Sequence, residues 1–493
     1  MSLSPRKELV VLKYHCRIGG ISFAIALQRK FPGFNNFTIY EKGNDVGGTW
    51  RVNTYPGCAC DVPVHFFSSS SDLKPDWDNT HAYQPQIYQY WKDLATKYQI
   101  YPYIQFNTLV TSAEWNSETH CYQIVTKNLA SGEETTSTAE ILVSALGILE
   151  VTKLPDIHGI SLFKGEIFHS AAWNHNVDLS GKRVAVIGNG ASATQFVPLI
   201  SQNKSVKVVN FCRTPNWFIW PLRATYNKFD IWMFKNLPLW IRIYRAYQFF
   251  KTEFFYFTAF KFAFTRRIFT FLCKLYIKHT APKKDVKNLI PTYTMGCKRV
   301  IFDSDYLASL HRPNVSLNWD GIESISEDGI VTKTGEKLPF DVIICATGFI
   351  TDQFPLHVKG TQNTIQEYYD AKGGPTAFLA TTIPEFPNFF MLGGPNATTG
   401  TTSVIYTEEN QSQYILKLIA PIINHPEQVC SIGVTAQATD KYNNKLQADL
   451  NRSVFVDCTS YYRKGRDGKV SSAWPYSASW HWWIFRNVQL AGL

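Results

Sequence analysis

Short apolar runs that lead into glycine and then into a helical pattern recur along the chain. Residues 184–187 precede a glycine-rich turn, and a second apolar run follows at 206–211. A buried parallel strand reads as a continuous apolar run, so this spacing predicts a βαβ unit. Near the N-terminus, runs at 9–12 and 37–40 flank a helical pattern over 21–30 and predict a second unit of the same kind.

Two further apolar runs, 141–147 and 342–348, end in small residues and predict the points where the chain crosses from one nucleotide-binding domain to the other. The predicted fold class is therefore α/β, with two interleaved Rossmann-like dinucleotide-binding domains and a helical insert. The predicted division of the chain is 1–150 for the first part of one domain, 151–349 for the inserted domain with its helical insert at 218–289, and 350–493 for the second part of the first domain.

Composition adds one local anomaly to this pattern. The 493 residues carry 45% apolar and 18% charged side chains, which is typical of a globular protein and excludes disorder. The formal net charge is +10, but residues 218–278 alone hold eleven Lys or Arg against two acids, so the remainder is nearly neutral. The same 61 residues contain 21 of the 73 aromatic side chains. One unusual insert therefore produces both the basic balance and the aromatic content.

The insert mixes apolar and basic residues at helical spacing, as in 241–250. The favoured interpretation is an amphipathic helical cover with solvated basic faces. A second interpretation is contact with a membrane surface, because basic amphipathic helices with aromatics bind anionic interfaces. Nucleic-acid binding is disfavoured because no recognition module accompanies the charge.

The N-terminal segment and the cysteine spacing indicate the cellular compartment of the protein. The N-terminus shows no apolar segment of signal-peptide length, and the densest aromatic run, 254–260, is far too short to span a bilayer. We therefore expect a cytoplasmic protein that is either free or peripheral to a membrane. The ten cysteines show no C-x-x-C pair, so we expect reduced thiols, no disulfide redox centre and no metal site.

The turn after 184–187 carries the fingerprint Gly188-x-Gly190-x-x-Ala193. The first glycine permits a tight turn, the second lets the backbone approach a pyrophosphate, and the alanine allows close packing of helix on strand. Twenty residues further on, where an NAD site places an acid, stands Arg213, and a cation suits the 2'-phosphate of NADP. The residues predicted to surround this nucleotide are Gly188, Asn189, Gly190, Ala191, Ser192, Ala193 and Thr194.

The N-terminal unit departs from the fingerprint at its turn. Counting back from Gly20 places His15 and Arg17 where two glycines belong, and side chains there obstruct a pyrophosphate. Glu41 nevertheless stands where an acid binds an adenosine ribose. Either this dinucleotide site is impaired, or residues 13–17 are an error in the translated gene, and the second interpretation is favoured.

A set of motifs in fixed order gives the chain a family resemblance. Phe163-x-Gly165-x-x-x-His169-x-x-x-Trp173-Asn174 resembles the fingerprint of type I Baeyer-Villiger monooxygenases, whose last position is usually Pro or Asp. The chain tail at 460–475 resembles fungal members that act in secondary metabolism. The other family-like motifs are Gly47-Gly48-Thr49-Trp50, Tyr55-Pro56-Gly57, Cys60-Asp61, Arg213-Thr214-Pro215, Lys298-Arg299, Ala346-Thr347-Gly348-Phe349 and Gly394-Pro395-Asn396.

The resemblance implies a reaction and its cofactors. FAD would be held by the discontinuous domain and NADPH by the inserted one, and one oxygen of O2 would be inserted beside the carbonyl of a ketone, giving an ester or lactone. Arg299 matches the family's active-site arginine, and Asp61 matches the carboxylate that positions it. The aromatic insert favours a large apolar ketone.

The resemblance also implies roles for the remaining motif residues. Lys298 would share the 2'-phosphate with Arg213, and Thr214 would donate a hydrogen bond to it. The expected flavin-binding residues are Gly20, Glu41, Thr49, Trp50, Cys60, Asp61 and Val110. The residues expected to couple the two domains during closure are Phe163, Gly165, His169 and Trp173.

Two alternatives stay open beside the ketone monooxygenase. One is a flavin N- or S-hydroxylase, against which Trp173 argues, because those relatives usually end the fingerprint in an aromatic residue followed by Lys. The other is an NADP-binding pseudoenzyme whose FAD site has decayed through His15 and Arg17.

Overall fold

Two five-stranded parallel sheets form the centre of the protein. A computed structural model describes residues 8–13, 18–147, 149–463 and 468–487. In order of pairing, the first sheet comprises β21 (Phe389–Met391), β7 (Ile141–Ser144), β1 (Leu9–Lys13), β2 (Phe37–Glu41) and β3 (Ile104–Gln105). The second comprises β14 (Val315–Asn318), β11 (Lys207–Phe211), β10 (Arg183–Ile187), β18 (Val342–Cys345) and β9 (Glu166–His169).

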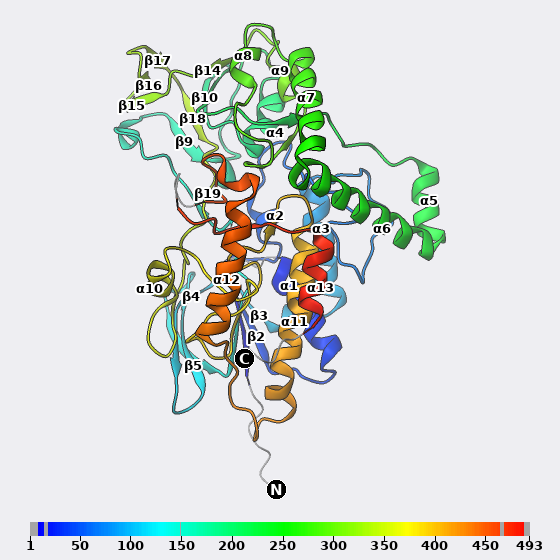
Figure 1. The fold of residues 1–493 in the computed structure, drawn as a ribbon. Coiled ribbons are helices and arrows are strands. Elements are labelled where there is room, and N and C mark those ends of the chain that lie inside the picture. The colour runs from blue at the N-terminus through cyan, green and yellow to red at the C-terminus, as the bar shows by residue number, and fades with distance from the viewer. Residues whose placement is uncertain (1–7, 14–17, 148, 464–467, 488–493) are drawn as a thin grey trace.

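Each sheet has a strand–helix–strand unit at its centre. In the first, β1 lies between β2 and β7, and α1 (Ile18–Lys30) connects β1 to β2. In the second, β10 lies between β11 and β18, and α4 (Ala191–Ile200) connects β10 to β11. The outward face of α1 packs against the long helix α11 (Val404–Asn424), which comes from the far end of the chain (Figure 1).

A separate mixed sheet shares a hydrophobic core with the first parallel sheet. It pairs β20 (His357–Lys359), β4 (Thr108–Asn116), β5 (Cys121–Asn128) and β6 (Glu134–Ala139) in that order. Tyr122 of β5 is fully buried, and its hydroxyl donates to the carbonyl of Pro387. The segment before β21 is thereby fixed against a hairpin about 265 residues earlier in the chain.

The chain passes between the two parallel sheets twice, and the two passages lie side by side. The strand β8 (Val151–Thr152) pairs antiparallel with β19 (Phe349–Ile350). The predicted fold class, two interleaved Rossmann-like domains, is confirmed. The boundaries proposed at 150 and 349 stay a prediction, although each falls close to one of these paired strands.

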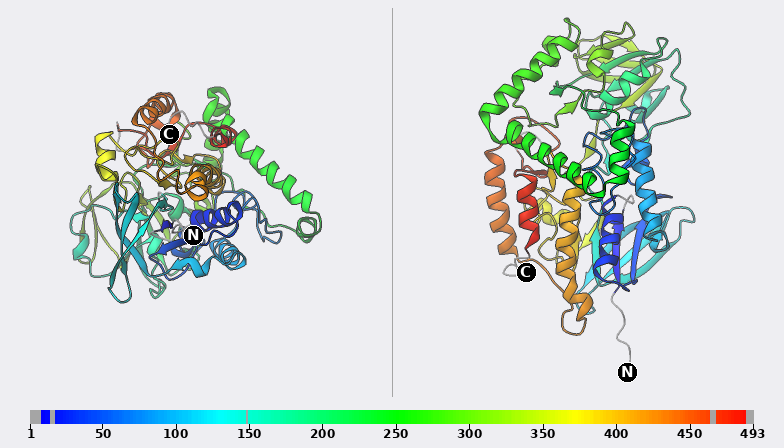
Figure 2. Two further views of the ribbon diagram at one scale, coloured as in Figure 1. Left: turned by 90° about the horizontal axis from the view of Figure 1, so that it is seen from below. Right: turned by 90° about the vertical axis from the view of Figure 1, so that its right-hand side faces the viewer.

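The insert is helical and lies on the outside of the molecule (Figures 1 and 2). It contains α5 (Lys228–Asn236), α6 (Pro238–Phe255), a π-helical turn at Tyr256–Lys261, α7 (Ala263–Thr280) and α8 (Val286–Leu289). Both acids of residues 218–278 serve as helix caps: Asp230 forms a capping box with Asn227, and Glu253 caps a helix near the C-terminus. Among the described residues, none of the helices has the length and apolar character needed to cross a bilayer.

The expectation that all cysteines are reduced is wrong for one pair. Cys297 and Cys458 form a disulfide with Cα atoms 6.0 Å apart. The two positions are separated by 161 residues, so no local spacing rule indicates their pairing. They meet because the tail after α12 (Ala436–Asn451) crosses over the loop that precedes β13 (Ile301–Phe302).

This disulfide gives a first prediction. Proteolysis of the native protein under non-reducing conditions should yield a peptide linking Cys297 to Cys458, and Cys458→Ser should remove it. Because a native disulfide typically contributes about 2–5 kcal/mol, the variant should also unfold at lower temperature. Cys430→Ser, at a partly exposed free cysteine, is the matched control and should change neither result. Two free thiols in the untreated wild-type protein would contradict the assignment.

Candidate functional site

The turn between β10 and α4 is built to receive a phosphate group. Gly188 has φ +105°, and a Cβ there would lie 2.5 Å from the carbonyl oxygen of Ala346, so only glycine fits. Gly190 is the N-cap of α4 and provides no side-chain cap, and the space where its Cβ would stand is open. The first N–H groups of α4 therefore face a space that an anion can enter.

The other fingerprint residues hold this turn in shape. The side-chain amide of Asn189 donates to the carbonyl of Thr214 at 3.0 Å, and that of Asn216 donates to the carbonyl of Asn189 at 2.8 Å. Ala193 is fully buried against the sheet, which explains why a small residue is needed there. Thr194 is also buried and donates to the carbonyl of Ala191. Ser192 stays partly exposed at the mouth of the turn.

Two cations stand beside this turn. The ammonium group of Lys298 donates to the hydroxyl of Thr214 at 2.6 Å, and Arg213 is exposed next to it. Burial and the positive charge of Arg213 both lower the pKa of Lys298. Two like charges held together in this way favour a multiply charged anion, and a 2'-phosphate satisfies that requirement.

The first sheet carries the second predicted nucleotide site. Glu41, the last residue of β2, is fully buried, and its carboxylate accepts a 2.6 Å hydrogen bond from the N–H of Gly43. Gly20 lies buried in the first turns of α1. His15 and Arg17, the predicted obstruction, lie outside the described residues. The described part of the site therefore fits an adenosine ribose at the carboxyl end of β2.

Of the other predicted flavin-binding residues, Thr49, Trp50 and Cys60 lie in or near the short helix α2 (Thr49–Val52), whereas Val110 lies apart from them in a different core cluster. Thr49 begins this helix, and the buried indole of Trp50 packs edge-on against Phe67, with ring centroids 5.6 Å apart. Cys60 is buried nearby, and burial raises the pKa of its thiol, which keeps it protonated. Val110 is buried in β4. The structure places these four side chains in or next to the core of the first domain.

Arg299 and Asp61 form a bidentate ion pair. The guanidinium donates from Nε and Nη2 to the two carboxylate oxygens at 2.8 and 2.7 Å, across 238 residues of sequence. Both side chains are mostly enclosed, with 26% and 30% exposure. Burial alone lowers the pKa of Arg299, but the Asp61 carboxylate and the hydroxyls of Tyr462 and Tyr461 outweigh it and raise that pKa. The arginine is therefore a permanent cation with a fixed orientation.

Tyr461 and Tyr462 complete the surroundings of this arginine and were not predicted as site residues. Their rings lie 4.2 Å apart, and burial raises the pKa of both hydroxyls. They belong to the same tail that carries Cys458, so the disulfide holds the tail next to the loop of Arg299. Two adjacent tyrosines have no spacing signal of their own, and only the family-like tail motif indicated this segment.

The predicted domain-coupling residues lie in β9 and the segments beside it, and among them the ring of His169 meets Phe349 of β19, with centroids 5.8 Å apart. The ring of Phe163 packs on Gly165, at which a Cβ would lie 2.5 Å from the carbonyl oxygen of Asp341. His169 ends β9, and its Nδ1 accepts from the N–H of Ala171, so the ring acts as a helix cap. Burial lowers the pKa of His169, which keeps the ring neutral.

Trp173 packs its indole against Phe196 of α4, with ring centroids 5.2 Å apart, so it contacts the nucleotide-binding helix directly. A coupling role of Phe163, Gly165, His169 and Trp173 in closure stays a prediction. The contacts themselves explain why the motif needs a glycine and large rings at these positions.

Gln195 of α4 is a bridging residue that the sequence did not reveal. Its side-chain amide donates to the carbonyl of Ala59 at 3.0 Å, and its oxygen accepts from the hydroxyl of Tyr55 at 3.0 Å. The same oxygen lies 3.3 Å from the N–H of Ala59. The loop that carries Cys60 and Asp61 is thereby tied to the helix that follows the Gly188 turn.

A glycine-marked strand-to-helix turn after β10, a buried acid at the end of β2 and a fixed arginine are together typical of oxidoreductases that use two dinucleotides. The chain belongs to the flavin-binding monooxygenase-like family, whose model matches residues 19–369.

Several known proteins are similar to this chain over nearly its whole length. A Baeyer-Villiger monooxygenase from Pseudomonas aeruginosa is 33% identical over 94% of this chain and 88% of its own length. The FAD-binding monooxygenase ktnD from Aspergillus niger is 33% identical over 93% of this chain and 77% of its own.

Solved structures show the same fold. OTEMO, crystallised in complex with FAD and NADP, superimposes with a TM-score of 0.85, at 23% identity and with 98% of each chain covered. A steroid monooxygenase bound to NADP gives a TM-score of 0.83 at 25% identity, with 97% of each chain covered.

The pair of cations beside the Gly188 turn gives a second prediction. Arg213→Ala and Lys298→Ala should each weaken binding of 2',5'-ADP by about 10–100-fold, because each removes one charge-assisted hydrogen bond of about 1.5–3 kcal/mol. Binding of 5'-AMP, which lacks the 2'-phosphate, should change little. Isothermal titration of both nucleotides measures the difference, and an equal loss for the two ligands would remove these cations from 2'-phosphate recognition.

Proposed function

We propose that this protein is an FAD- and NADPH-dependent Baeyer-Villiger monooxygenase. It inserts one oxygen atom of O2 next to the carbonyl of a ketone and gives an ester or lactone, while the other oxygen leaves as water and NADPH is oxidised. The observation that carries the proposal is the bidentate pair of Arg299 and Asp61, a fixed cation at the position where the family resemblance expects it. Family membership and the Baeyer-Villiger monooxygenase among its relatives support the same reaction.

The residues that the structure describes fit both cofactors. Gly188, Gly190 and the start of α4 would hold the pyrophosphate of NADPH, and the cations Arg213 and Lys298 its 2'-phosphate. Glu41 would bind the adenosine ribose of FAD, with the segment around α2 beside the ring system. When bound, the flavin supplies the oxygen-activating chemistry and NADPH the hydride. The known structures of this fold with FAD and NADP support that pairing.

Arg299 acts by stabilising negative charge on oxygen. Asp61 engages Nε and Nη2 and thereby orients the guanidinium, whose remaining N–H groups would donate towards an oxyanion. Attack on a ketone carbonyl places negative charge on its oxygen, and a cation held in advance stabilises that charge without reorganisation. Tyr462 is buried next to the pair and reduces access of water to it.

The substrate that we propose is a large apolar ketone of secondary metabolism. The aromatic insert and the fungal FAD-binding monooxygenases among the relatives support this choice. A ketone of that kind partitions into membranes, so we also propose that residues 218–278 contact a membrane surface.

The function is tested by expressing the chain, recording its visible spectrum and supplying NADPH, isotopically labelled O2 and an apolar ketone such as a steroid. We expect a yellow protein and a product that carries one labelled oxygen in an ester or lactone. Labelled N- or S-oxides from amine or sulfide probes, without any ester, would support the hydroxylase instead. A folded protein that takes up no FAD would support the pseudoenzyme and contradict the proposal.

Replacing the arginine gives a third prediction. Arg299→Ala should lower the rate of ester formation by at least about 10²–10³-fold, because it removes one preorganised donor to the oxyanion. Oxidation of NADPH should continue and release hydrogen peroxide, since the nucleotide sites are untouched. Arg452→Ala, an exposed arginine at the end of α12, is the matched control. Undiminished ester formation in the Arg299 variant would remove this residue from the mechanism.

A further inference from the structure

A large cavity lies away from the site described above, between α1, α6, α11 and α13 (Ala478–Arg486). Its volume is about 1150 Å³, and its inner wall includes Phe66, Phe249 and Tyr406, whose rings lie within 5.8 Å of one another. The helices α1, α11 and α13 lie side by side in the ribbon views (Figures 1 and 2). The cavity is thus an aromatic recess in one face of the molecule.

Exposed aromatic side chains surround the mouth of this recess. Phe250 of α6 is 67% exposed, and Trp482 and Trp483 of α13 are 43% and 53% exposed. These three side chains also line the cavity. A patch of three exposed aromatic side chains is unfavourable in water and usually marks a surface that another molecule covers.

The aromatic rim continues along α6 as a regular stripe. Trp240, Ile243, Tyr247, Phe250 and Phe254 are spaced three or four residues apart and are all exposed, with Phe254 at 70%. The opposite side of the same helix is buried through Ile241, Gln248 and Thr252. Since one side already packs against the protein, the outward stripe is not needed for folding.

Cations flank the same surface. Arg29, Lys30 and Arg242 line the cavity and are exposed. On the two helices, the ammonium group of Lys251 lies 5.4 Å from the ring centroid of Tyr247, and the guanidinium of Arg486 lies 5.0 Å from that of Trp482. Each aromatic segment therefore has a positive charge at its edge.

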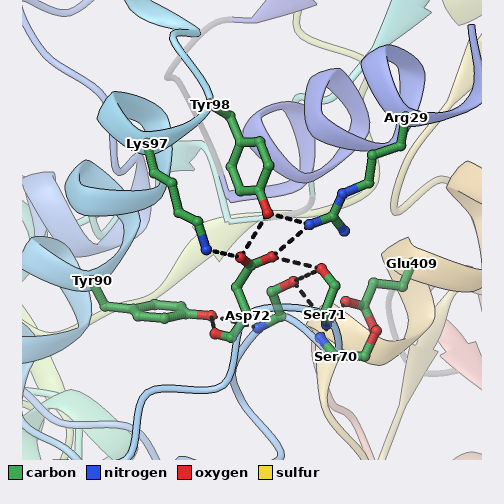
Figure 3. A network of polar contacts seen from close by, with 9 residues as sticks. Arg29, Ser70, Ser71, Asp72, Tyr90, Lys97, Tyr98 and Glu409 are labelled. Carbon is green, nitrogen blue, oxygen red and sulfur yellow. Dashed lines mark hydrogen bonds and ion pairs between the residues drawn. The ribbon is translucent and has the colours of Figure 1, made fainter. Parts of the chain in front are cut away.

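The carboxylates near the recess are neutralised within the protein. Figure 3 shows Asp72 enclosed by Arg29, Lys97 and Tyr98, and its side chain is only 5% exposed. These partners lower the pKa of Asp72 to about 2 despite its partial burial, so it stays ionised and paired. Asp72 thus offsets the charge of Arg29 and Lys97, whereas Lys30 and Arg242 of the cavity wall are not among its partners.

The other two carboxylates are also engaged. Glu409 accepts the N–H of Ser70 at 2.7 Å and lies 3.8 Å from the guanidinium of Arg245 (Figure 3 shows its contact with Ser70). Glu253, the one acid of α6 and α13, caps α13 by accepting the N–H groups of Ala478 and Ser479. The described residues of the two helices therefore present aromatic and cationic groups outward with no free carboxylate.

We propose that this surface, the outward stripe of α6 with the tryptophans of α13, docks on a membrane leaflet that contains anionic phospholipid. Tryptophan and tyrosine prefer the headgroup level of a bilayer, and flanking lysine and arginine bind its negative charge. The charge of this surface identifies anionic phospholipid as the lipid class that it contacts. This inference rests on the proposed function in one respect, because the leaflet would be the reservoir of the apolar ketone.

Charge complementarity favours a lipid surface over a second copy of the chain. In a twofold dimer the same patch meets itself, so the arginines and lysines of one copy would face those of the other. Like charges across an interface oppose association. An anionic leaflet instead neutralises all of them at once.

The proposal is tested with the full-length protein and sedimented vesicles, without NADPH or ketone. We expect strong binding to vesicles of phosphatidylcholine with phosphatidylserine, weak binding to phosphatidylcholine alone, and release by high salt. Phe250→Ser with Phe254→Ser should reduce the bound fraction at least about tenfold, because two inserted rings are lost. Leu154→Ser, at a residue 58% exposed on another part of the chain, is the matched control and should bind like wild type.

A second double variant replaces exposed cations, so its effect on vesicle binding does not depend on a loss of apolar packing. Arg242→Gln with Lys251→Gln should weaken binding to the anionic vesicles by roughly 25-fold, since each cation near such a surface contributes about 1 kcal/mol. Equal binding to both vesicle types, or wild-type binding by both double variants, would overturn the proposal. A dimer in solution that the serine variants dissociate, without vesicle binding, would assign the surface to a second copy.

Flavin content and ester formation on a small water-soluble ketone, measured without vesicles, separate this proposal from the proposed function. If those activities are present and vesicle binding is absent, only the docking surface fails. If vesicle binding is present and no ester forms from this ketone or from the apolar ketone of the functional test, the docking surface stands and the proposed reaction is wrong.

Discussion

The ion pair of Arg299 and Asp61 is the constraint on which the arrangement of the site depends. A guanidinium that is three-quarters enclosed is tolerated only with a carboxylate in good geometry, and removing either partner leaves an uncompensated charge. Asp61 follows α2, Arg299 precedes β13, and the tail with Tyr461 and Tyr462 closes over both. Three segments that are far apart in sequence are therefore held to one another at a single cation.

The nucleotide-binding turn differs from the Arg299 site, because no acid among the described residues neutralises its positive groups. Lys298 and Arg213 repel each other, and α4 begins without a side-chain cap. Both features are unfavourable for the protein alone and become favourable when phosphate groups arrive. At Arg299 the protein has supplied its own counter-charge, so this cation is kept for charge that develops only during reaction.

The sequence was sufficient for those features that repeat locally. Apolar runs predicted β1, β10 and β11 to within one residue at each end, whereas the run at 342–348 extends three residues beyond β18. The positive φ of Gly188 agrees with the need for a glycine in the turn. Motif order was sufficient to bring Arg299 and Asp61 to the same place, although 238 residues separate them. Periodicity alone could not have paired them.

Features that depend on contacts between distant segments could not be predicted from the sequence. The disulfide of Cys297 and Cys458 contradicted the expected thiols because its two halves meet only through the path of the tail. Gln195 bridges the domains, yet a glutamine in a helix carries no signal in its spacing. For the insert, the sequence reveals the excess of basic residues but not which side of each helix carries them. Only the structure reveals that Asp230 and Glu253 are used as helix caps. Because the buried Glu253 is the one acid of α6 and α13, the outward charge of these two helices is positive, and the compositional excess becomes a surface with a defined electrostatic partner.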